Sequence, residues 1–296
     1  MCEREAREFL HRLLPKALLA DDRSLVELLR TLSFLPIAIS QAAAYIKRNR
    51  TPMSKYISLL QDSDKAGISL LSREFPDHTR YSEPRHAVAT TWLVSFKQIQ
   101  GTDRAAAQLL SFMSQIEPRA IPETMLPRTG TEEELENAVG TLSAYAFLQR
   151  REDGKTLDMH SLVHLAARVW VHHGIDGPKV RQAAVVHLVT VFQSDDCDDR
   201  QIWRQYMPHV LKMLQDSRGN GKWGEECRLG FWAGRCLQVE GRVEEAVDLL
   251  EHVVQVRETT LAENHPDRLA SQHVLVGAYE ANSQVKEAID LLEHVV

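Results

Sequence analysis

Apolar residues recur three and four positions apart along most of the chain, which is the spacing of one face of an α-helix. Near the end of the sequence this pattern repeats almost residue for residue. Residues 245–254 (EAVDLLEHVV) return as residues 287–296 (EAIDLLEHVV), and only Val247 and Ile289 differ. A second apolar set precedes each copy, made of Leu229, Trp232, Ala233, Cys236 and Leu237 in the first and of Val274, Leu275, Ala278 and Tyr279 in the second. The pattern predicts two consecutive helix-turn-helix units.

The polar positions between these helices predict where each helix ends. Gly241-Arg242 supplies the turn of the first unit, and Asn282-Ser283 takes its place in the second, where short polar side chains can satisfy the backbone. Residues 264–267 (NHPD) separate the units, because proline is tolerated only in the first turn of a helix. The two units are about 42 residues apart, which is within the range of stacked helical hairpins. They resemble tetratricopeptide repeats, which implies a surface for protein ligands and no catalytic role.

The first part of the chain, residues 1–64, reads as a helical segment. Its helices are broken near Asp21-Asp22 and near Pro36, and residues 40–48 form an alanine-rich helix that could pack closely against its neighbours. Residues 178–222 read as a helical linker, with two helices joined by the acidic stretch 195–199. The repeats then occupy residues 223–296, the second of them incomplete.

Within residues 65–177 the spacing of the apolar positions changes from that of helices to that of a short β-hairpin. Helices are predicted at residues 88–99, 105–116 and 132–143, and a hairpin follows around Asp153-Gly154, because Asp-Gly accepts the positive φ angles of a tight turn. A helix at residues 161–172 closes the region. Three helices, a two-stranded wing and a closing helix indicate a winged-helix domain, with a predicted core of Leu135, Val139, Leu142, Leu162 and Val169. The expected fold is therefore mainly α, with a small β-hairpin wing followed by an α-solenoid.

Composition and charge narrow the possible partners. The chain of 296 residues is 26% charged and 44% hydrophobic, with a net charge of −6, which argues against nucleic acid and acidic membranes as partners. The best apolar run, residues 33–45, is too short and too interrupted to span a bilayer. The four cysteines have no metal-binding or redox spacing, so reduced thiols in the cytoplasm or nucleus are expected, and the location assigned is cytoplasmic.

Several short segments together carry a family resemblance. They are residues 34–39 (FLPIAI), 41–46 (QAAAYI), 87–92 (AVATTW), 144–148 (AYAFL) and 158–164 (DMHSLVH). The chain resembles the ARC segment and winged helix of fungal NB-ARC (STAND) NOD-like receptors with kinesin-light-chain-type repeats. The resemblance implies an intracellular signalling receptor of the innate-immunity or incompatibility type. In that family a nucleotide-binding domain holds ADP in the resting state, and the repeats act as the sensor.

Two nucleotide-binding residues carry over through this resemblance, Pro36 near the adenine and His160 at the β-phosphate of ADP. Each residue also has a simpler explanation that involves no nucleotide. A proline at a helix start fixes the entry angle of the chain, and His160 can be a solvated histidine. The sequence also departs from the family pattern. Phe34 stands where the family has its first glycine, and Ser161 replaces the aspartate that would follow the histidine.

The phosphate-binding loop of that family is missing from the sequence. A P-loop needs Gly-x-x-x-x-Gly-Lys-[Ser/Thr], so that backbone N–H groups cradle the phosphates. Gly154-Lys155-Thr156 would place Gln149 at the first glycine, and Gly221-Lys222 is followed by Trp223. The chain is therefore expected to be the C-terminal part of such a receptor without its P-loop domain, with no cofactor of its own, whereas the full-length family uses ADP or ATP.

Catalysis and metal binding have little support in the sequence. No Gly-x-Ser-x-Gly elbow is present, so no catalytic residue is assigned. His160 and His164 are one helical turn apart, but Ser161 occupies the position of the catalytic glutamate of His-Glu-x-x-His enzymes and no third ligand is apparent. The chain is expected to be neither an enzyme nor a metal protein.

Two other functions remain as alternatives. A kinesin-light-chain-like adaptor would use the same repeats, but it would be expected to carry heptads for pairing with a heavy chain, and none are seen. A winged-helix DNA-binding regulator would read DNA with the segment at residues 131–137 (TEEELEN), which is acidic where phosphate contact needs lysine or arginine. The wing offers only Arg150, Arg151 and Lys155 as a basic cluster.

Self-association is the last expectation. The sequence stops in the middle of the second repeat's outer helix, so this repeat is expected to lack a cap. Apolar side chains would then have no following helix to cover them, and the terminal repeat of a solenoid normally needs a polar outer face. The residues concerned are Ile289, Leu292, Val295 and Val296.

Overall fold

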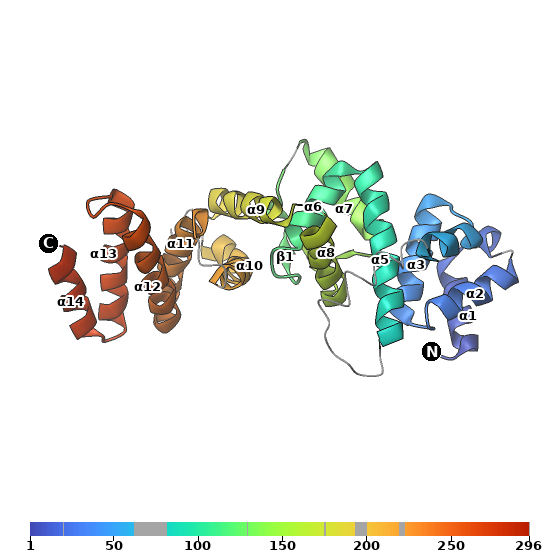
Figure 1. The fold of residues 1–296 in the computed structure, drawn as a ribbon, viewed down its shortest axis with the longest axis horizontal. Helices are drawn as coiled ribbons and strands as arrows, with labels where there is room; N and C mark the ends of the chain where they lie inside the picture. The colour runs from blue at the N-terminus through green and yellow to red at the C-terminus, as the bar shows by residue number, and fades with distance from the viewer. Residues whose placement is uncertain are drawn as a thin grey trace. The chain divides into compact units, whose positions relative to one another are not determined.

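A computed structural model describes residues 1–19, 21–61, 82–128, 130–174, 176–192, 200–218 and 223–295 of the chain. The chain divides into two compact units. The first unit comprises Met1–Arg119 and Leu126–Val180, and the second comprises Ala120–Met125 and Arg181–Val296. Helices make up most of both units, as predicted (Figure 1). The predicted acidic linker at residues 195–199, the Gly221-Lys222 pair and Val296 lie outside the described residues.

Short helices open the first unit. Helix α1 (Glu3–Leu13) is followed by a 3-10 turn η1 (Lys16–Leu18), α2 (Asp22–Thr31), α3 (Pro36–Asn49) and a helix over residues 53–61. The carboxylate of Asp21 accepts the backbone N–H groups of Arg23 and Ser24 and so caps α2. Pro36 occupies the first turn of α3, where its missing N–H costs nothing. Both helix boundaries predicted from the sequence are confirmed.

The second half of this unit contains the predicted helices and hairpin. Helices α5 (Ser82–Thr102), α6 (Arg104–Met113) and α7 (Glu132–Ala144) come first, then strands β2 (Leu148–Arg150) and β3 (Thr156–Met159), then α8 (Ser161–Gly174). The strands pair antiparallel, with Leu148 opposite Met159. In the turn, Gly154 has a φ of 66°, and the Asp153 carboxylate accepts the N–H groups of Lys155 and Thr156 at 2.8 and 2.9 Å.

Aromatic rings from distant parts of the sequence meet in the core of this unit. The ring of Phe96 on α5 lies 5.0 Å from that of Phe147 and 5.3 Å from that of Trp170 on α8. Helix α5 packs against α3, α6 and α8, so it joins the N-terminal helices to the helices around the hairpin (Figure 1).

The predicted core of this unit is wrong at one residue, Leu162. Val139, Leu142 and Val169 are buried as predicted, and Leu135 is half-buried, but the side chain of Leu162 is 45% exposed. The reason is the side from which the neighbouring helices pack against α8. Because α5 and α6 both pack against α8, the buried arc of α8 is centred on Val163, Ala167 and Trp170, and Leu162 lies at its edge in the first turn.

The second unit is built from the remaining helices. It contains the short strand β1 (Ile121–Pro122), the 3-10 turn η2 (Glu123–Met125), most of α9 (Gly177–Val191) and α10 (Arg200–Arg218). Side chains of α9 and α10 hold the segment Ala120–Met125 in this unit. His187 Nε2 lies 2.8 Å from the carbonyl oxygen of Met125, and the Tyr206 hydroxyl donates to Thr124 at 2.8 Å. Helix α10 also packs against α11, the first helix of the repeats.

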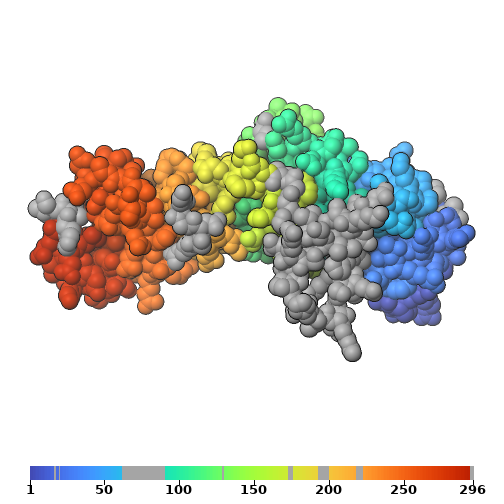
Figure 2. Space-filling view, in the orientation of Figure 1, coloured from blue at the N-terminus to red at the C-terminus, as the bar shows by residue number. Residues whose placement is uncertain are grey.

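The repeats form two helical hairpins at the C-terminal side of this unit. The helices are α11 (Glu225–Glu240), α12 (Val243–Thr260), α13 (Pro266–Ala281) and α14 (Val285–Val295). Each helix packs against the next one in sequence (Figure 1). In the space-filling view, α14 forms one end of this unit, in red (Figure 2).

Candidate protein-binding surface

A tight turn and close packing define the first hairpin. Gly241 ends α11 in the left-handed conformation, with a φ of 78°, and the Arg242 guanidinium beside Glu245 lowers the pKa of that carboxyl at the start of α12. Gly234 lets the two helices approach, because a Cβ atom at this position would lie only 2.6 Å from the Cγ atom of Leu250.

The junction between the hairpins is sealed by apolar and polar contacts. Val247, Leu250 and Val254 of α12 pack in one cluster with residues of α13, namely Leu275, Val276, Ala278 and Tyr279. The Tyr279 hydroxyl donates to Glu251 at 2.8 Å, and the buried Arg257 donates to the carbonyl oxygen of Asp267 at 2.6 Å. The two hairpins therefore share one continuous core, as predicted from the repeat pattern.

The second hairpin repeats this geometry with a different turn. Asn282 ends α13, and Ser283 adopts the left-handed conformation that glycine supplies in the first hairpin, with a φ of 60°. Pro266 begins α13 after His265, whose Nδ1 accepts the N–H of Asp267 at 3.1 Å. The three turn and cap positions read from the sequence are thus confirmed.

Helices α11 and α13 lie side by side and form a shared exposed surface. The Gln238 side chain on α11 donates to the carbonyl oxygen of Val274 on α13 at 3.1 Å, which fixes the two helices next to each other. We define the repeat face by the solvent-accessible residues along both helices: Arg228, Phe231, Trp232 and Arg235 on α11, and Ala270, His273 and Gly277 on α13. Exposed surfaces that run along stacked hairpins are what repeat proteins use to bind ligands.

The α11 half of the repeat face is an arginine–aromatic cluster. The Arg235 guanidinium carbon lies 5.2 Å from the ring centroid of Trp232 and 5.8 Å from that of Phe231. Arg257 approaches Phe231 from α12 at 5.2 Å, and burial lowers the pKa of this arginine. Cation–π contacts of this kind hold the planar groups in place. Arginine and tryptophan are also the side chains that contribute most at protein interfaces.

The sequence pattern placed Trp232 in the apolar set of the first repeat, and no motif singled out the arginines beside it. In the structure Trp232 is only half-buried, and the Arg235 guanidinium lies over its ring. The spacing of Arg228, Phe231, Trp232 and Arg235, at i, i+3, i+4 and i+7, was the available signal, since such residues lie on one side of a helix.

The two residues carried over from the nucleotide-binding family lie in the first unit, each at the start of a helix. Pro36 begins α3 and is exposed. His160 precedes α8 and is also exposed, and its Nδ1 accepts the N–H of Leu162 at 3.2 Å. Helix α5 packs against both α3 and α8. The structure therefore gives each residue a role in starting a helix, and their role toward a nucleotide stays a prediction.

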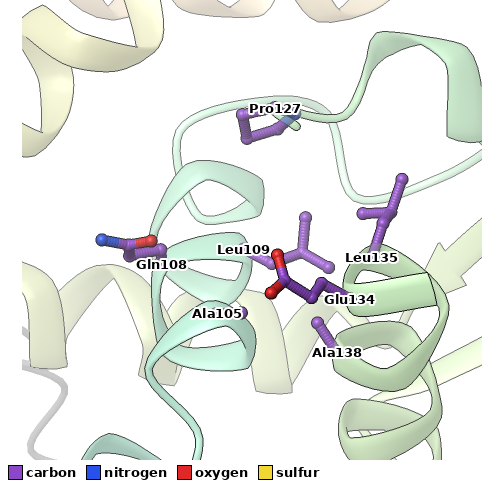
Figure 3. Close-up of a pocket in the computed structure, with 7 residues that line it drawn as sticks. All are labelled: Ala105, Gln108, Leu109, Pro127, Glu134, Leu135 and Ala138. Atoms are coloured by element: carbon purple, nitrogen blue, oxygen red, sulfur yellow. The ribbon is translucent and has the colours of Figure 1, made fainter. Parts of the chain in front are cut away.

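A small hollow in the first unit lies between α6 and α7 and contains neither of these residues. Its walls are Ala105, Gln108, Leu109, Pro127, Glu134, Leu135 and Ala138 (Figure 3). The Glu134 carboxylate in this hollow accepts the N–H of Thr131 at 3.1 Å, and the Thr131 hydroxyl accepts the N–H of Glu134 at 3.2 Å. The one charged side chain of the hollow is thus engaged in a capping box.

The two arginines of the β2–β3 hairpin, Arg150 and Arg151, are paired with carboxylates of the first unit. Arg150 lies 3.0 Å from Glu136 of α7, and Arg151 makes two bonds of 2.8 Å to Asp158 across the hairpin. The first turn of α7 carries Glu132, Glu133 and Glu134.

Across the described ranges, no three His, Cys, Asp or Glu side chains stand close enough to hold a metal ion. None of the described helices has the length and apolar character needed to cross a membrane.

Residues 230–296 match the family model described as tetratricopeptide repeat. These hairpins are tetratricopeptide repeats. The match begins within α11 and runs through α14, so the tetratricopeptide repeats coincide with the helices that carry the repeat face.

A relative covers most of the chain. It is the "Nucleotide-binding leucine-rich repeat (NLR)-like protein" of Hyaloscypha variabilis, which is 34% identical over 264 residues. The match includes 87% of this chain and 26% of the relative, so the chain spans about a quarter of the relative's length. The chain is therefore similar to an NLR-like protein well beyond its tetratricopeptide repeats.

Two solved structures also match. They are crystal structures of kinesin-light-chain nearly identical TPR-like repeats from Podosopora anserina, the second of them of a variant with a single substitution. Each is 25% identical and covers 55% of this chain and 82% of its own, with TM-scores of 0.28 and 0.27. TM-scores this low do not establish a common overall arrangement.

Proposed function

We propose that this chain is the protein-binding part of an NLR-like intracellular signalling receptor, and that its tetratricopeptide repeats bind a protein ligand through the repeat face. The observation that carries the proposal is the partly exposed arginine–aromatic cluster of Phe231, Trp232 and Arg235 on α11, a helix that packs against α12 and against α13 of the next hairpin. A rigid scaffold presenting large planar side chains loses little conformational entropy on binding.

The receptor part of the proposal is supported by the NLR-like relative, whose similarity extends over 87% of the chain and so includes the first unit. In the whole receptor, ADP or ATP would occupy a nucleotide-binding domain, and the role would be innate immunity or incompatibility. This chain would bind no nucleotide tightly by itself, would catalyse no reaction and would act in the cytoplasm. Pro36 and His160 would contact the nucleotide only within the whole receptor.

Two other functions have less support. DNA binding by the winged helix is disfavoured, because Arg150 and Arg151 already pair with Glu136 and Asp158, and a phosphate would have to displace these carboxylates. A motor adaptor of the kinesin-light-chain kind would use the same repeats. Similarity to an NLR-like protein over most of the chain favours the receptor.

The proposal is tested by comparing the proteins that the chain captures from an extract of its source organism. We expect a protein captured by the wild-type chain to be lost from the Trp232→Ala and Arg235→Glu variants. The matched control is Arg4→Glu on α1, which reverses an exposed arginine of the first unit, whose side chain is 87% exposed. This control should retain the captured protein. Equal capture by Arg235→Glu and the wild-type chain would refute binding through the repeat face.

A further inference from the structure

A concentration of positive charge lies at the end of α3 and the start of the next helix. Lys47 and Arg48 lie in the last turn of α3, Arg50 follows it, and Lys55 lies in the first turn of the helix over residues 53–61. All four side chains are exposed, and we call them the basic patch. Residues 28–61 contain no aspartate or glutamate. With a net charge of −6 for the whole chain and +4 for the basic patch, the rest of the chain carries −10.

The basic patch has no counter-charge in the part of the molecule that the structure describes. None of its four side chains forms an ion pair or a hydrogen bond with another described residue. Other exposed arginines of the first unit do form such pairs, as Arg4 does with Glu8 and Arg151 with Asp158. The positive charges of the basic patch are therefore available to an anionic partner.

The stability of the helices accounts for only part of the basic patch. Lys47 and Arg48 end α3, where the helix dipole favours cations. Lys55 lies at the third position of its helix, where the dipole disfavours a cation. The same position is Glu5 in α1 and Glu134 in α7, and each of these glutamates completes a capping box. Lys55 thus opposes local stability, which is typical of residues retained for binding.

The two helices that carry the basic patch are held together by buried aromatic rings. The ring centroids of Tyr45 on α3 and Tyr56 on the following helix are 4.9 Å apart, and both residues are buried. Tyr56 directly follows Lys55, and Tyr45 precedes Arg48 by three positions. The backbone beside the basic side chains is therefore fixed, so a partner has to order little more than the side chains themselves.

We propose that the basic patch binds an acidic segment of a protein partner. Carboxylates of the segment pair with Lys47, Arg48, Arg50 and Lys55, and each arginine can hold a carboxylate through two parallel N–H bonds. A short segment fits better than an anionic membrane or nucleic acid, because such extended surfaces would also face the rest of the chain, whose net charge of −10 repels them. The inference goes beyond the proposed function, since the basic patch belongs to the first unit and the repeat face to the second.

The test measures, by fluorescence anisotropy, the binding of a short fluorescein-labelled peptide in which glutamate alternates with serine. The wild-type chain should bind this peptide, and added salt should weaken the binding. Lys55→Glu should weaken it about tenfold, because an attraction becomes a repulsion. The matched control is Arg23→Glu, which reverses an exposed charge in the first turn of α2 and should bind like the wild-type chain. A wild-type chain that does not bind, or equal losses in the two variants, overturns the proposal.

A variant of the repeat face shows which surface holds the peptide. Arg235→Glu should leave the dissociation constant of the glutamate peptide unchanged, because Arg235 lies outside the basic patch. If Arg235→Glu loses as much affinity as Lys55→Glu, the acidic ligand is not specific to the basic patch and the proposal fails. This result would leave the proposed function of the repeat face intact.

Two further measurements address the alternatives. Thermal unfolding should show Lys55→Glu to be at least as stable as the wild-type chain, since a carboxylate suits the first turn of a helix. A less stable variant would assign Lys55 to the fold and overturn its role in binding. The chain should also remain unbound in flotation with phosphatidylcholine vesicles that contain phosphatidylserine. Flotation that is lost in Lys55→Glu would replace the protein partner with a membrane.

Discussion

Asn49 and Tyr145 exchange two hydrogen bonds although they are 96 positions apart in the sequence. The Asn49 amide donates to the Tyr145 hydroxyl at 2.9 Å, and that hydroxyl donates to the side-chain carbonyl oxygen of Asn49 at 3.2 Å. The pair ties the end of α3 to the end of α7, and burial raises the pKa of the Tyr145 hydroxyl. It is one of the contacts that make the N-terminal helices and the hairpin region a single unit.

The variant Tyr145→Phe should therefore destabilise the first unit. It removes both hydrogen bonds while keeping the ring, so we expect the free energy of unfolding to fall by about 1 kcal/mol. Tyr45→Phe is the matched control, because the Tyr45 hydroxyl lies 3.5 Å from Gln98 and makes at most a weak bond. Urea denaturation measures both. Equal losses in the two variants would contradict the assignment of the stability to the Asn49–Tyr145 pair.

The close approach of α11 and α12 gives a second prediction. Gly234→Ala would place a methyl group against Leu250, so we expect a loss of about 1–3 kcal/mol from overpacking. Gly140→Ala in α7 is the control, since no atom lies within 4 Å of its added Cβ. Alanine should stabilise that helix by about 0.5–1 kcal/mol, because glycine is the poorer helix former. Thermal unfolding would refute the packing argument if both variants changed stability in the same direction.

Nucleotide binding gives a third prediction. The chain should show no tight binding of ADP or ATP in a calorimetric titration, because the sequence lacks a P-loop to cradle the phosphates. A micromolar dissociation constant that disappears in His160→Ala would reveal a site. Since His160 also caps α8, His160→Asn should accompany it, as asparagine can keep the cap while removing the imidazole.

The fourth prediction concerns DNA. Fluorescence anisotropy at physiological ionic strength should give a dissociation constant for duplex DNA that is weaker than about a micromolar. A lower value would mean binding tighter than ordinary non-specific binding. The reason is the pairing of Arg150 with Glu136 and of Arg151 with Asp158. Salt-dependent binding that is lost in the Arg150→Ala/Arg151→Ala variant would instead favour a DNA-binding regulator.

The Cys227 thiol gives a prediction about pH. Burial raises the pKa of this thiol from an ordinary value of 9.0 to about 11. The folded state therefore favours the protonated thiol more than the unfolded state does. Its contribution to stability is present in full below pH 9 and is lost as the pH rises from 9 to 11. The difference in unfolding free energy between the wild-type chain and Cys227→Ala should shrink over this interval. A difference that stays constant from about pH 8 to 11 would count against the burial of the thiol.

The sequence by itself determined most of the local structure. Pro36, Pro266 and Asp21 mark helix starts, because a ring or a carboxylate at these positions suits only the first turn or the cap. Gly241 and Asp153-Gly154 mark turns for equally local reasons. The near-identity of residues 245–254 and 287–296 identified the repeats directly, since one hairpin of this kind buries its apolar side on the next.

The tertiary structure decided which side of each helix is covered. Periodicity marks an apolar stripe, but the direction of the neighbouring helices decides how far burial extends around it. That is why Leu162 is exposed although it continues the stripe of α8, and why Ile289 is exposed although Val247 is buried. The same holds for segment Ala120–Met125, which belongs to the second unit. His187 and Tyr206, far later in the chain, hold it there, and no local pattern encodes contacts at such separations.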